Sequence, residues 1–408
     1  MDDLHGNLRG IIEHMDDIQN LGIDVLYMTP IFQSNSCHKY DTTAYYQIDP
    51  SFGTTEDLKE LVQKAHERGM KVVLDAVYNH TGREFFAFAD ILENGEKSKY
   101  RDWYFIDGFP LKSEWGEIPN FKCFGYYGGM PKLNLKNPEV EKYITDVACY
   151  WIKECDIDGW RLDVGDEISH FFWKNFRKAV KAVKKDLLII GEIWHYAGDF
   201  LEGDEWDTVM NYPFYLNLID LLADEKITVS QFVQNLGYLK GRLNKNCYPL
   251  MWNLIDSHDT ARFLHLCNDN KKKQHLAAAF QLLLPGMPMI YYGDEYAMPG
   301  ANDPDCRRGM YWDEEYQDKE MYEWYKRLIQ VRKSHACIVE GELAGIVTED
   351  EEGTIVLIRK NGEETIAMIF NCSSSAKKFN EYTQKYNLLT ENTFDGNVEG
   401  FDAAVIVL

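Results

Sequence analysis

Several features that mark particular classes of protein are missing from this 408-residue sequence. It contains no glycine-rich phosphate loop, no internal repeat and no low-complexity tract. The missing phosphate loop argues against an enzyme that acts on a phosphate-bearing substrate. Long hydrophobic runs are missing too, because the most apolar stretch, 277–290, is interrupted by Gln281, Pro285, Gly286 and Pro288. The sequence therefore predicts a chain with no membrane-spanning segment.

Positive charge is also in short supply. Lys and Arg number 43 against 66 Asp and Glu, which gives a formal net charge of -23. Such a surface repels the phosphates of nucleic acids, whose binding depends on Lys and Arg, so no nucleic-acid partner is expected. A neutral ligand such as a sugar meets no such repulsion. Aromatic residues make up 14% of the chain; flat rings of this kind stack on sugars, although most aromatic side chains in any protein fill the core.

Cysteine pairs at zinc-ligand spacing are missing as well. The nine cysteines are scattered along the chain, and buried free thiols are the simplest interpretation of that pattern. Free thiols suit a reducing compartment, so we expect the protein in the cytoplasm. The segment Met1–His5 has neither the basic nor the apolar region of a signal peptide, which agrees with that expectation.

Apolar runs typical of buried strands alternate with helical patterns along most of the chain. Asp24–Thr29 and Lys71–Tyr78 are the first two of these runs. Alternation of this kind predicts parallel βαβ units. The strands expected after these two are Gly159–Val164, Leu187–Ile193, Thr208–Met210, Leu250–Ile255 and Met289–Tyr292.

Helices near the N-terminus can be bounded from the sequence. Apolar residues at helical spacing over Leu8–Leu21 predict one helix, which Gly22 ends. A second helix opens at Thr54, with Asp57 as its capping-box partner, and closes at Gly69. Further helices are expected to start near Pro138, Glu167, Val229, Thr260 and Lys319.

Seven strands are one fewer than a (β/α)8-type barrel requires. We therefore predict an α/β fold with such a barrel, its first strand missing, and a C-terminal all-β domain that begins near Cys337. The segment after Lys71–Tyr78 is too long for a βα loop and predicts a small inserted domain. The expected limits are 1–80 for the first part of the barrel, 81–137 for the inserted domain B, 138–336 for the second part of the barrel and 337–408 for the β domain.

Four of the expected strands end in unusual polar clusters. Any one cluster alone could be a structural cap or an ion pair. Together they would gather several acids, histidines and an arginine around one point, because barrel enzymes collect functional groups at the carboxyl ends of their strands. The clusters are Asp75-Ala76-Val77-Tyr78-Asn79-His80, Gly159-Trp160-Arg161-Leu162-Asp163, Gly191-Glu192-Ile193-Trp194-His195 and Asp256-Ser257-His258-Asp259-Thr260.

Residue types in these clusters suit the cleavage of a glycosidic bond, which needs a carboxylate nucleophile and a carboxylic acid. Arg161 precedes Asp163 by two residues on the same strand face, and its guanidinium would keep that carboxylate ionised. Glu192 would lie in drier surroundings near Trp194 and stay protonated until it donates. Asp259 can stabilise the positive charge that develops on the sugar.

The clusters resemble, in order, the strand-three, nucleophile, acid and transition-state motifs of the α-amylase family of glycoside hydrolases. Met130-Pro131-Lys132-Leu133-Asn134 is similar to the fifth motif of neopullulanases, cyclomaltodextrinases and maltogenic amylases. Glu167, after Val164-Gly165-Asp166, also suits that subgroup better than the Lys-His pair of typical α-amylases. Five spaced motifs fall in the correct order, and the resemblance runs through almost the whole chain.

The resemblance implies a role for each catalytic candidate. Asp163 would be the nucleophile, Glu192 the general acid/base and Asp259 the stabiliser of the transition state. His80 and His258 would hydrogen-bond the sugar at the cleavage subsite.

Other residues that match the family's motifs would also contact the substrate. Tyr40, in His38-Lys39-Tyr40-Asp41, would stack on the sugar at the cleavage subsite, or else is a packed loop aromatic. Asp303 and Arg307 would bind the next glucose outward, or else form a plain surface ion pair. Trp194 would belong to the acceptor side or simply shield Glu192.

Two parts of the subgroup's architecture are expected to be absent. Gly6–Ile11 resembles the segment just after the first barrel strand, so neither that strand nor the subgroup's N-terminal β-sandwich module is expected. A calcium site in the missing loop would be lost with it, so no metal and no cofactor are predicted. Dimerisation through the absent module is excluded, and the oligomeric state stays open.

The function implied is a retaining glycosidase that cleaves α-1,4 bonds, with α-1,6 bonds left open, in cyclomaltodextrins, pullulan or starch. Retention through a covalent glucosyl-enzyme requires the two catalytic carboxyls to lie roughly 5–5.5 Å apart. The alternative is a catalytically impaired carbohydrate-binding remnant, disabled by the missing strand.

Overall fold

A computed structural model describes residues 6–112 and 118–408 of the chain. The expectation about Met1–His5 therefore falls outside the described residues. The chain divides into two compact units. The first comprises Met1–Ile193 and Asp199–Val209, and the second comprises Trp194–Gly198 and Met210–Leu408.

A five-stranded parallel sheet forms the centre of the first unit. Its strand order is β1-β4-β5-β6-β7, so each strand pairs with the next along the chain except across the β2–β3 hairpin. Most of these residues are buried, as expected for parallel strands covered on both faces. The five strands are β1 (Val25–Met28), β4 (Lys71–Ala76), β5 (Gly159–Leu162), β6 (Leu188–Gly191) and β7 (Thr208–Val209), and β2 (Phe32–Ser34) and β3 (Thr42–Ile48) form a separate antiparallel pair.

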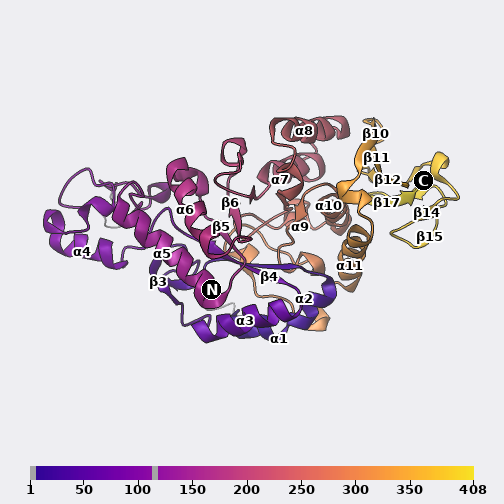
Figure 1. Ribbon diagram of the computed structural model, residues 1–408. Coiled ribbons are helices and arrows are strands. Elements are labelled where there is room, and N and C mark those ends of the chain that lie inside the picture. The colour runs from indigo at the N-terminus through magenta and orange to yellow at the C-terminus, as the bar shows by residue number, and fades with distance from the viewer. Residues whose placement is uncertain (1–5, 113–117) are drawn as a thin grey trace. The chain divides into compact units, whose positions relative to one another are not determined.

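Helices between the strands follow the sequence closely. The capping box of Thr54 and Asp57 is present at the start of α3. The single helix expected over Leu8–Leu21 is instead two, α1 and α2, which meet at His14. Helices α1 and α3 lie side by side in Figure 1. The helices of this unit are α1 (Leu8–Glu13), α2 (Met15–Leu21), α3 (Thr55–Glu67), α4 (Phe86–Asn94), α5 (Pro138–Cys155) and α6 (His170–Val183).

Among its described residues, the long segment between β4 and α5 contains the helix α4 and three short 3-10 helices. Isolated bridges join Tyr104 to Leu133 and Cys123 to Pro131, so the segment folds back on itself. A further bridge, His80 to Lys132, ties its far end to the residues that follow β4. The limits 81–137 for a separate inserted domain stay a prediction.

Gly191, the last residue of β6, has a steric role. A Cβ atom there would lie 2.2 Å from the ring of Trp206, far inside contact distance. The Trp206 ring packs flat against Phe200 at 4.0 Å between centroids. Close packing against β6 therefore requires glycine directly before Glu192.

The second unit contains a short parallel pair of strands, β8 (Trp252–Asn253) and β9 (Met287–Pro288). The strand expected at Met289–Tyr292 was placed too late: the ladder uses the N–H groups of Met287 and Met289, with Pro288 between them. The helix expected near Glu167 begins at His170, and that expected near Thr260 begins at Phe263. The helices of this unit are α7 (Tyr212–Leu218), η7, a π-helix (Ile219–Ala223), α8 (Val229–Arg242), α9 (Phe263–Leu266), α10 (Lys271–Leu283), α11 (Lys319–Ser334) and α12 (Cys337–Glu340).

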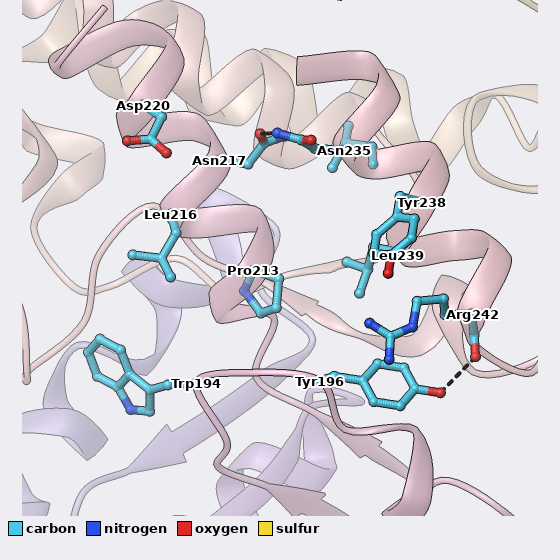
Figure 2. A pocket seen from close by; sticks show the side chains of 11 residues that line it. Trp194, Tyr196, Pro213, Leu216, Asn217, Asp220, Asn235, Tyr238, Leu239 and Arg242 are labelled. Atoms are coloured by element: carbon cyan, nitrogen blue, oxygen red, sulfur yellow. Dashed lines mark hydrogen bonds between the residues drawn. The ribbon is translucent and has the colours of Figure 1, made fainter. Parts of the chain in front are cut away.

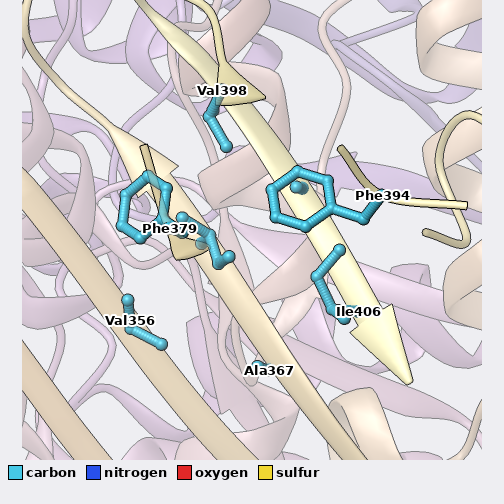
Figure 3. Packing of buried hydrophobic residues seen from close by; sticks show 8 residues of the cluster. Val356, Ala367, Phe379, Phe394, Val398 and Ile406 are labelled. Carbon is cyan, nitrogen blue, oxygen red and sulfur yellow. The ribbon is translucent and has the colours of Figure 1, made fainter. Parts of the chain in front are cut away.

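The C-terminal part of the second unit is an antiparallel sheet in the order β10-β11-β12-β17-β14-β15. Figure 3 shows the apolar cluster on one face of the sheet, to which Val356, Ala367 and Ile406 contribute. Ala404 belongs to the same cluster as Ile406, because residues two apart on a strand face the same side of a sheet. On the other face Phe370 stacks on Phe280 of α10 at 4.3 Å. The β structure expected for the C-terminal part of the chain is confirmed. The strands are β10 (Glu342–Glu349), β11 (Thr354–Asn361), β12 (Glu364–Asn371), β13 (Lys377–Lys378), β14 (Tyr386–Asn387), β15 (Asn392–Thr393), β16 (Asn397–Val398) and β17 (Asp402–Val407).

All nine cysteines are free, as expected. The expectation of burial is confirmed for Cys155, Cys267, Cys306 and Cys337, whereas Cys37 is exposed and the other four are partly buried. Over the described ranges, no helix combines the length and the apolar character needed to cross a bilayer.

Candidate active site

Arg161 on β5 is the centre of a buried charge cluster in the first unit. Its side chain is fully buried, and its Nη1 lies 3.0 Å from Asp75 and 2.9 Å from Asp163. Its Nη2 lies 2.9 Å from Oε2 of Glu192. Burial alone would lower the pKa of Arg161, but Asp75 and Glu192 outweigh that effect and raise it well above its usual range. One guanidinium therefore joins both candidate catalytic carboxylates of this unit, and the expected contact between Arg161 and Asp163 is confirmed.

The carboxylate of Asp75 accepts hydrogen bonds from two tyrosine hydroxyls. The Tyr27 hydroxyl donates to Oδ2 of Asp75 at 2.6 Å, and the Tyr40 hydroxyl donates to the same oxygen at 3.2 Å. Asp75 comes from β4 and Arg161 from the neighbouring β5, where the two residues are register partners. The pairing of β4 with β5 thus places Asp75, which accepts from both tyrosine hydroxyls, beside Arg161.

Besides its ion pair with Arg161, Glu192 accepts a backbone hydrogen bond. The backbone N–H of Val164 donates to its Oε2 at 2.9 Å. Val164 has a φ of 46° and a ψ of 43°, the left-handed region that a β-branched residue rarely adopts. The residue after Asp163 is therefore strained in a way that turns its N–H toward Glu192, and strain of this kind gathers at functional sites.

His80 follows β4 and is almost completely buried. Its Nε2 donates to the carbonyl oxygen of Tyr40 at 3.0 Å, because a carbonyl can only accept. The amide of Asn79 lies 3.4 Å from the other ring nitrogen. Lys132 donates to Asn79 at 2.6 Å and contacts the Glu167 carboxylate at 2.8 Å. Lys132 of the fifth motif thus stabilises the loop that carries His80.

The pH dependence of stability should report the burial of His80. Desolvation lowers the pKa of His80 from its ordinary 6.5 to about 4, so the folded protein keeps the ring neutral where the unfolded chain takes up a proton. The stabilisation is present above pH 6.5 and is lost as the pH falls toward 4. As the pH falls from 6.5 to 4, we expect the free energy of unfolding of the His80→Gln variant to decrease by about 3 kcal/mol less than that of the wild type. Urea unfolding at several pH values measures the difference, and parallel curves would contradict it.

The second unit holds the fourth motif. Nε2 of His258 lies 3.1 Å from Oδ2 of Asp259, and Nη2 of Arg307 lies 3.5 Å from Oδ1 of the same carboxylate. Nε of Arg307 donates to the carbonyl oxygen of His258 at 2.8 Å and also lies 3.0 Å from Asp303. Arg307 is buried, whereas Asp303 is mostly exposed. This unit therefore brings together His258, Asp259, Asp303 and Arg307.

A tight turn positions Asp259. Its N–H donates to the Ser257 hydroxyl at 3.2 Å, and the Thr260 hydroxyl accepts from the N–H of Ser257 at 3.0 Å. Side-chain hydroxyls that bind nearby backbone groups fix such turns without regular structure. The carboxylate of Asp259 remains partly exposed and accessible to a ligand.

Trp194 lies in the second unit, stacked on Tyr212 with ring centroids 3.8 Å apart and planes within 12°. Its ring is 40% exposed, so one part of the indole faces solvent. A pre-stacked, exposed indole suits ligand binding better than core filling.

Three acidic residues of this unit, Asp256, Asp294 and Glu295, are buried. Asp256 accepts from the N–H of Phe263 at 2.7 Å, and Arg262 lies 3.2 Å from Asp294. Burial raises the pKa of Asp256 and of Asp294 above the usual range. Glu295 accepts from the N–H of Gly293 at 2.7 Å.

Glu295→Gln should change how stability depends on pH. Desolvation raises the pKa of Glu295 from 4.5 to about 7, so the folded protein keeps the proton that the unfolded chain loses first. That contribution is present below pH 4.5 and is lost as the pH rises through 7. We therefore expect Glu295→Gln, which has no proton to lose, to gain about 3 kcal/mol relative to the wild type between pH 4.5 and 8. Denaturation of both proteins at pH 4.5 and at pH 8 tests this. The same difference in stability between variant and wild type at the two pH values would contradict it.

Each unit brings its own predicted residues together. These are Tyr40, His80, Arg161, Asp163 and Glu192 in the first unit, and His258, Asp259, Asp303 and Arg307 in the second. Sequence reasoning missed Tyr27 and gave no role to Asp75. The available signal for Tyr27 was its place near the carboxyl end of β1. Within the described residues, no group of three or more His, Cys, Asp or Glu side chains is arranged to hold a metal ion. The absence of a cofactor stays a prediction.

Comparisons with known proteins agree with the geometry. A family model described as "Alpha amylase, catalytic domain" matches residues 1–319. A cyclomaltodextrinase of Geobacillus thermopakistaniensis is 48% identical over 371 residues, which are 91% of this chain and 63% of that relative. Neopullulanase 2 of Thermoactinomyces vulgaris is 43% identical over 367 residues, 90% of this chain and 62% of its own length. The chain thus spans less than two thirds of each of these two relatives.

A solved structure extends the likeness to the fold. The cyclic α-maltosyl-(1→6)-maltose hydrolase of Arthrobacter globiformis, in complex with that cyclic sugar, has a TM-score of 0.91 and 35% identity. The match covers 99% of this chain and 90% of that protein.

Proposed function

This chain belongs to the α-amylase family, and from that premise we propose that it is a retaining glycoside hydrolase that cleaves α-1,4-glucosidic bonds. The observation that supports this best is the single buried guanidinium of Arg161, which contacts both Asp163 and Glu192. A retaining glycosidase needs one carboxylate as nucleophile and a second carboxyl close by as acid and base.

In the first step Asp163 attacks the anomeric carbon of the glucosyl unit. The bond from that carbon to the glycosidic oxygen breaks, and Glu192 transfers its proton to the departing oxygen. Oε2 of Glu192 accepts from the N–H of Val164 and lies 2.9 Å from Nη2 of Arg161, so we assign the transferred proton to Oε1. Arg161 keeps Asp163 charged for attack.

In the second step Glu192, now ionised, takes a proton from water. The oxygen of that water attacks the anomeric carbon, and the ester bond to Asp163 breaks. Two inversions return the original anomeric configuration. Asp259 is assigned the stabilisation of the positively charged transition state in both steps, on the strength of its motif.

The remaining matched residues are assigned to substrate. Tyr40 stacks on the sugar at the cleavage point, and His80 and His258 hydrogen-bond its hydroxyls. Asp303 and Arg307 bind the next glucose outward. Trp194 is assigned to the acceptor side.

We assign the substrate class from the relatives' names. Cyclomaltodextrinase and neopullulanase name enzymes that act on cyclomaltodextrins and pullulan, and starch shares their α-glucosidic bonds. The solved complex holds a sugar with α-1,6 linkages, which keeps α-1,6 cleavage open for this chain. No cofactor is required by the two steps, and the free thiols support a cytoplasmic location.

Analysis of the products formed from α-glucans distinguishes two alternatives to this function. Transglycosylation follows if a sugar hydroxyl replaces water in the second step. A catalytically impaired binding remnant, the second candidate from the sequence, would bind glucans without releasing products.

Product analysis on soluble starch, β-cyclodextrin and pullulan, with the wild type and Glu192→Gln in parallel, tests the proposal. Maltose or panose that depends on Glu192 supports it, and the preferred substrate then places the chain within the subgroup. Folded wild-type protein that binds these sugars and releases nothing would favour the binding remnant.

A further inference from the structure

A cleft of about 350 Å³ lies in the second unit, outside the residues assigned to the reaction apart from Trp194. Figure 2 shows its walls: Trp194 and Tyr196 come from the segment after Glu192, Pro213 and Leu216 from α7, and Tyr238 and Arg242 from α8. In that view Trp194 and Tyr238 lie at opposite ends, with Pro213 between them. The volume falls at the lower end of the range of about 300–1,000 Å³ that ligand sites occupy.

Aromatic rings at this cleft are fixed and yet exposed. The Arg242 guanidinium lies 3.9 Å from the centroid of the Tyr196 ring and 5.3 Å from that of Tyr238, so it is held between two rings. The Tyr196 hydroxyl donates to the carbonyl oxygen of Arg242 at 2.8 Å, so a hydrogen bond joins these two residues in addition to the ring contact. Tyr238 is 67% exposed all the same. Fixed tyrosine faces bind ligands at low entropic cost.

Neutral polar groups line the other side of the cleft. Asn235 donates to the amide oxygen of Asn217 at 2.8 Å, and Asn217 donates to the carbonyl of Phe232 at 3.1 Å. Asp220 projects from the π-helix η7, a form of helix that often occurs at functional sites.

Charge in the cleft balances, since Asp220 and Arg242 are its only charged lining residues among those described. The Arg242 guanidinium faces are in contact with two rings, while its in-plane N–H groups can still donate to hydroxyls, and the Asp220 carboxylate in the same cleft disfavours a phosphate or carboxylate ligand. Flat apolar faces together with amide groups suit a neutral, polyhydroxylated ligand.

We propose that this cleft is an outer α-glucan subsite that binds glucosyl residues of long chains, with Tyr238 as its stacking platform and Asn235 and Arg242 as its polar contacts. This inference rests on the proposed function for the identity of the sugar. The chain itself connects the cleft to the acid motif, because only Ile193 separates Trp194 from Glu192. Such a site adds affinity for long glucans and none for short ones.

Calorimetric titration of the full chain with maltoheptaose and with maltotriose tests the subsite, in the Glu192→Gln background so that no sugar is consumed. We expect Tyr238→Ala to weaken maltoheptaose binding about tenfold, which corresponds to about 1.4 kcal/mol, and to leave maltotriose binding unchanged. Tyr238→Phe, which keeps the ring, should bind as the parent does. Tyr316→Ala is the matched control, because Tyr316 is an exposed tyrosine of the same unit outside the cleft.

Unchanged maltoheptaose affinity in a folded Tyr238→Ala variant would overturn the subsite, and so would an equal loss for both sugars. The binding measurement does not depend on turnover, so a subsite that fails while the wild type hydrolyses starch leaves the proposed function standing. Tyr238-dependent binding in a chain that cleaves no glucan would instead refute the proposed hydrolase.

Discussion

Asp163→Asn is expected to lower turnover on soluble starch by about 10⁴-fold or more while leaving glucan affinity largely unchanged. An amide of the same shape cannot form the ester to the anomeric carbon, but it retains the contact with Arg161, 2.9 Å away. Initial rates and calorimetric binding of maltoheptaose measure the two effects separately.

A matched control for this variant is Asp146→Asn, which changes an exposed carboxylate paired with Lys142 on α5. Its rate should equal that of the wild type. Rates near wild type in Asp163→Asn would mean that another group is the nucleophile.

Arg161→Met should give the largest loss of stability. The variant removes the cation that faces Asp75, Asp163 and Glu192 and leaves those carboxylates buried without it. Removing one partner from a buried ion pair costs about 3–5 kcal/mol, so we expect a loss of at least that size in the free energy of unfolding. Guanidinium unfolding monitored by tryptophan fluorescence measures it.

Two further variants make this prediction specific. Arg9→Met, which removes the surface ion pairs of Arg9 with Asp57 and Glu60, should change stability little. Asp75→Asn added to Arg161→Met should restore part of the loss, because one buried negative charge is gone. An Arg161→Met variant as stable as Arg9→Met would contradict the account of the cluster.

Much of the secondary structure could be predicted because local pattern and final structure agree. Buried parallel strands such as β4 and β6 are short apolar runs, and the capping box of Thr54 and Asp57 is a three-residue signal. The error at β9 arose because the apolar residues after Pro288 resemble a strand. Tyr291 and Tyr292 instead have their rings over Arg262, at 4.5 and 5.1 Å.

The site was predictable where its contacts are local. Arg161 lies on β5 and Asp163 follows directly after that strand, two residues along the chain, so their contact follows from the local extended backbone. Tyr27 reaches Asp75 across 48 positions, and Lys132 reaches Glu167 across 35. No periodicity records such pairs, because strand pairing and the fold of the segment before α5 create them.

The measurement that tests the central claim most directly is the anomeric configuration of the first product. Proton NMR of maltoheptaose hydrolysis, recorded within minutes of mixing, distinguishes the α-anomer from the β-anomer before mutarotation mixes them. The account predicts that the α-anomer appears first, since attack by Asp163 and then by water inverts the anomeric carbon twice. A β-anomer as the first product would contradict it, because one inversion requires Asp163 to act without forming a covalent bond.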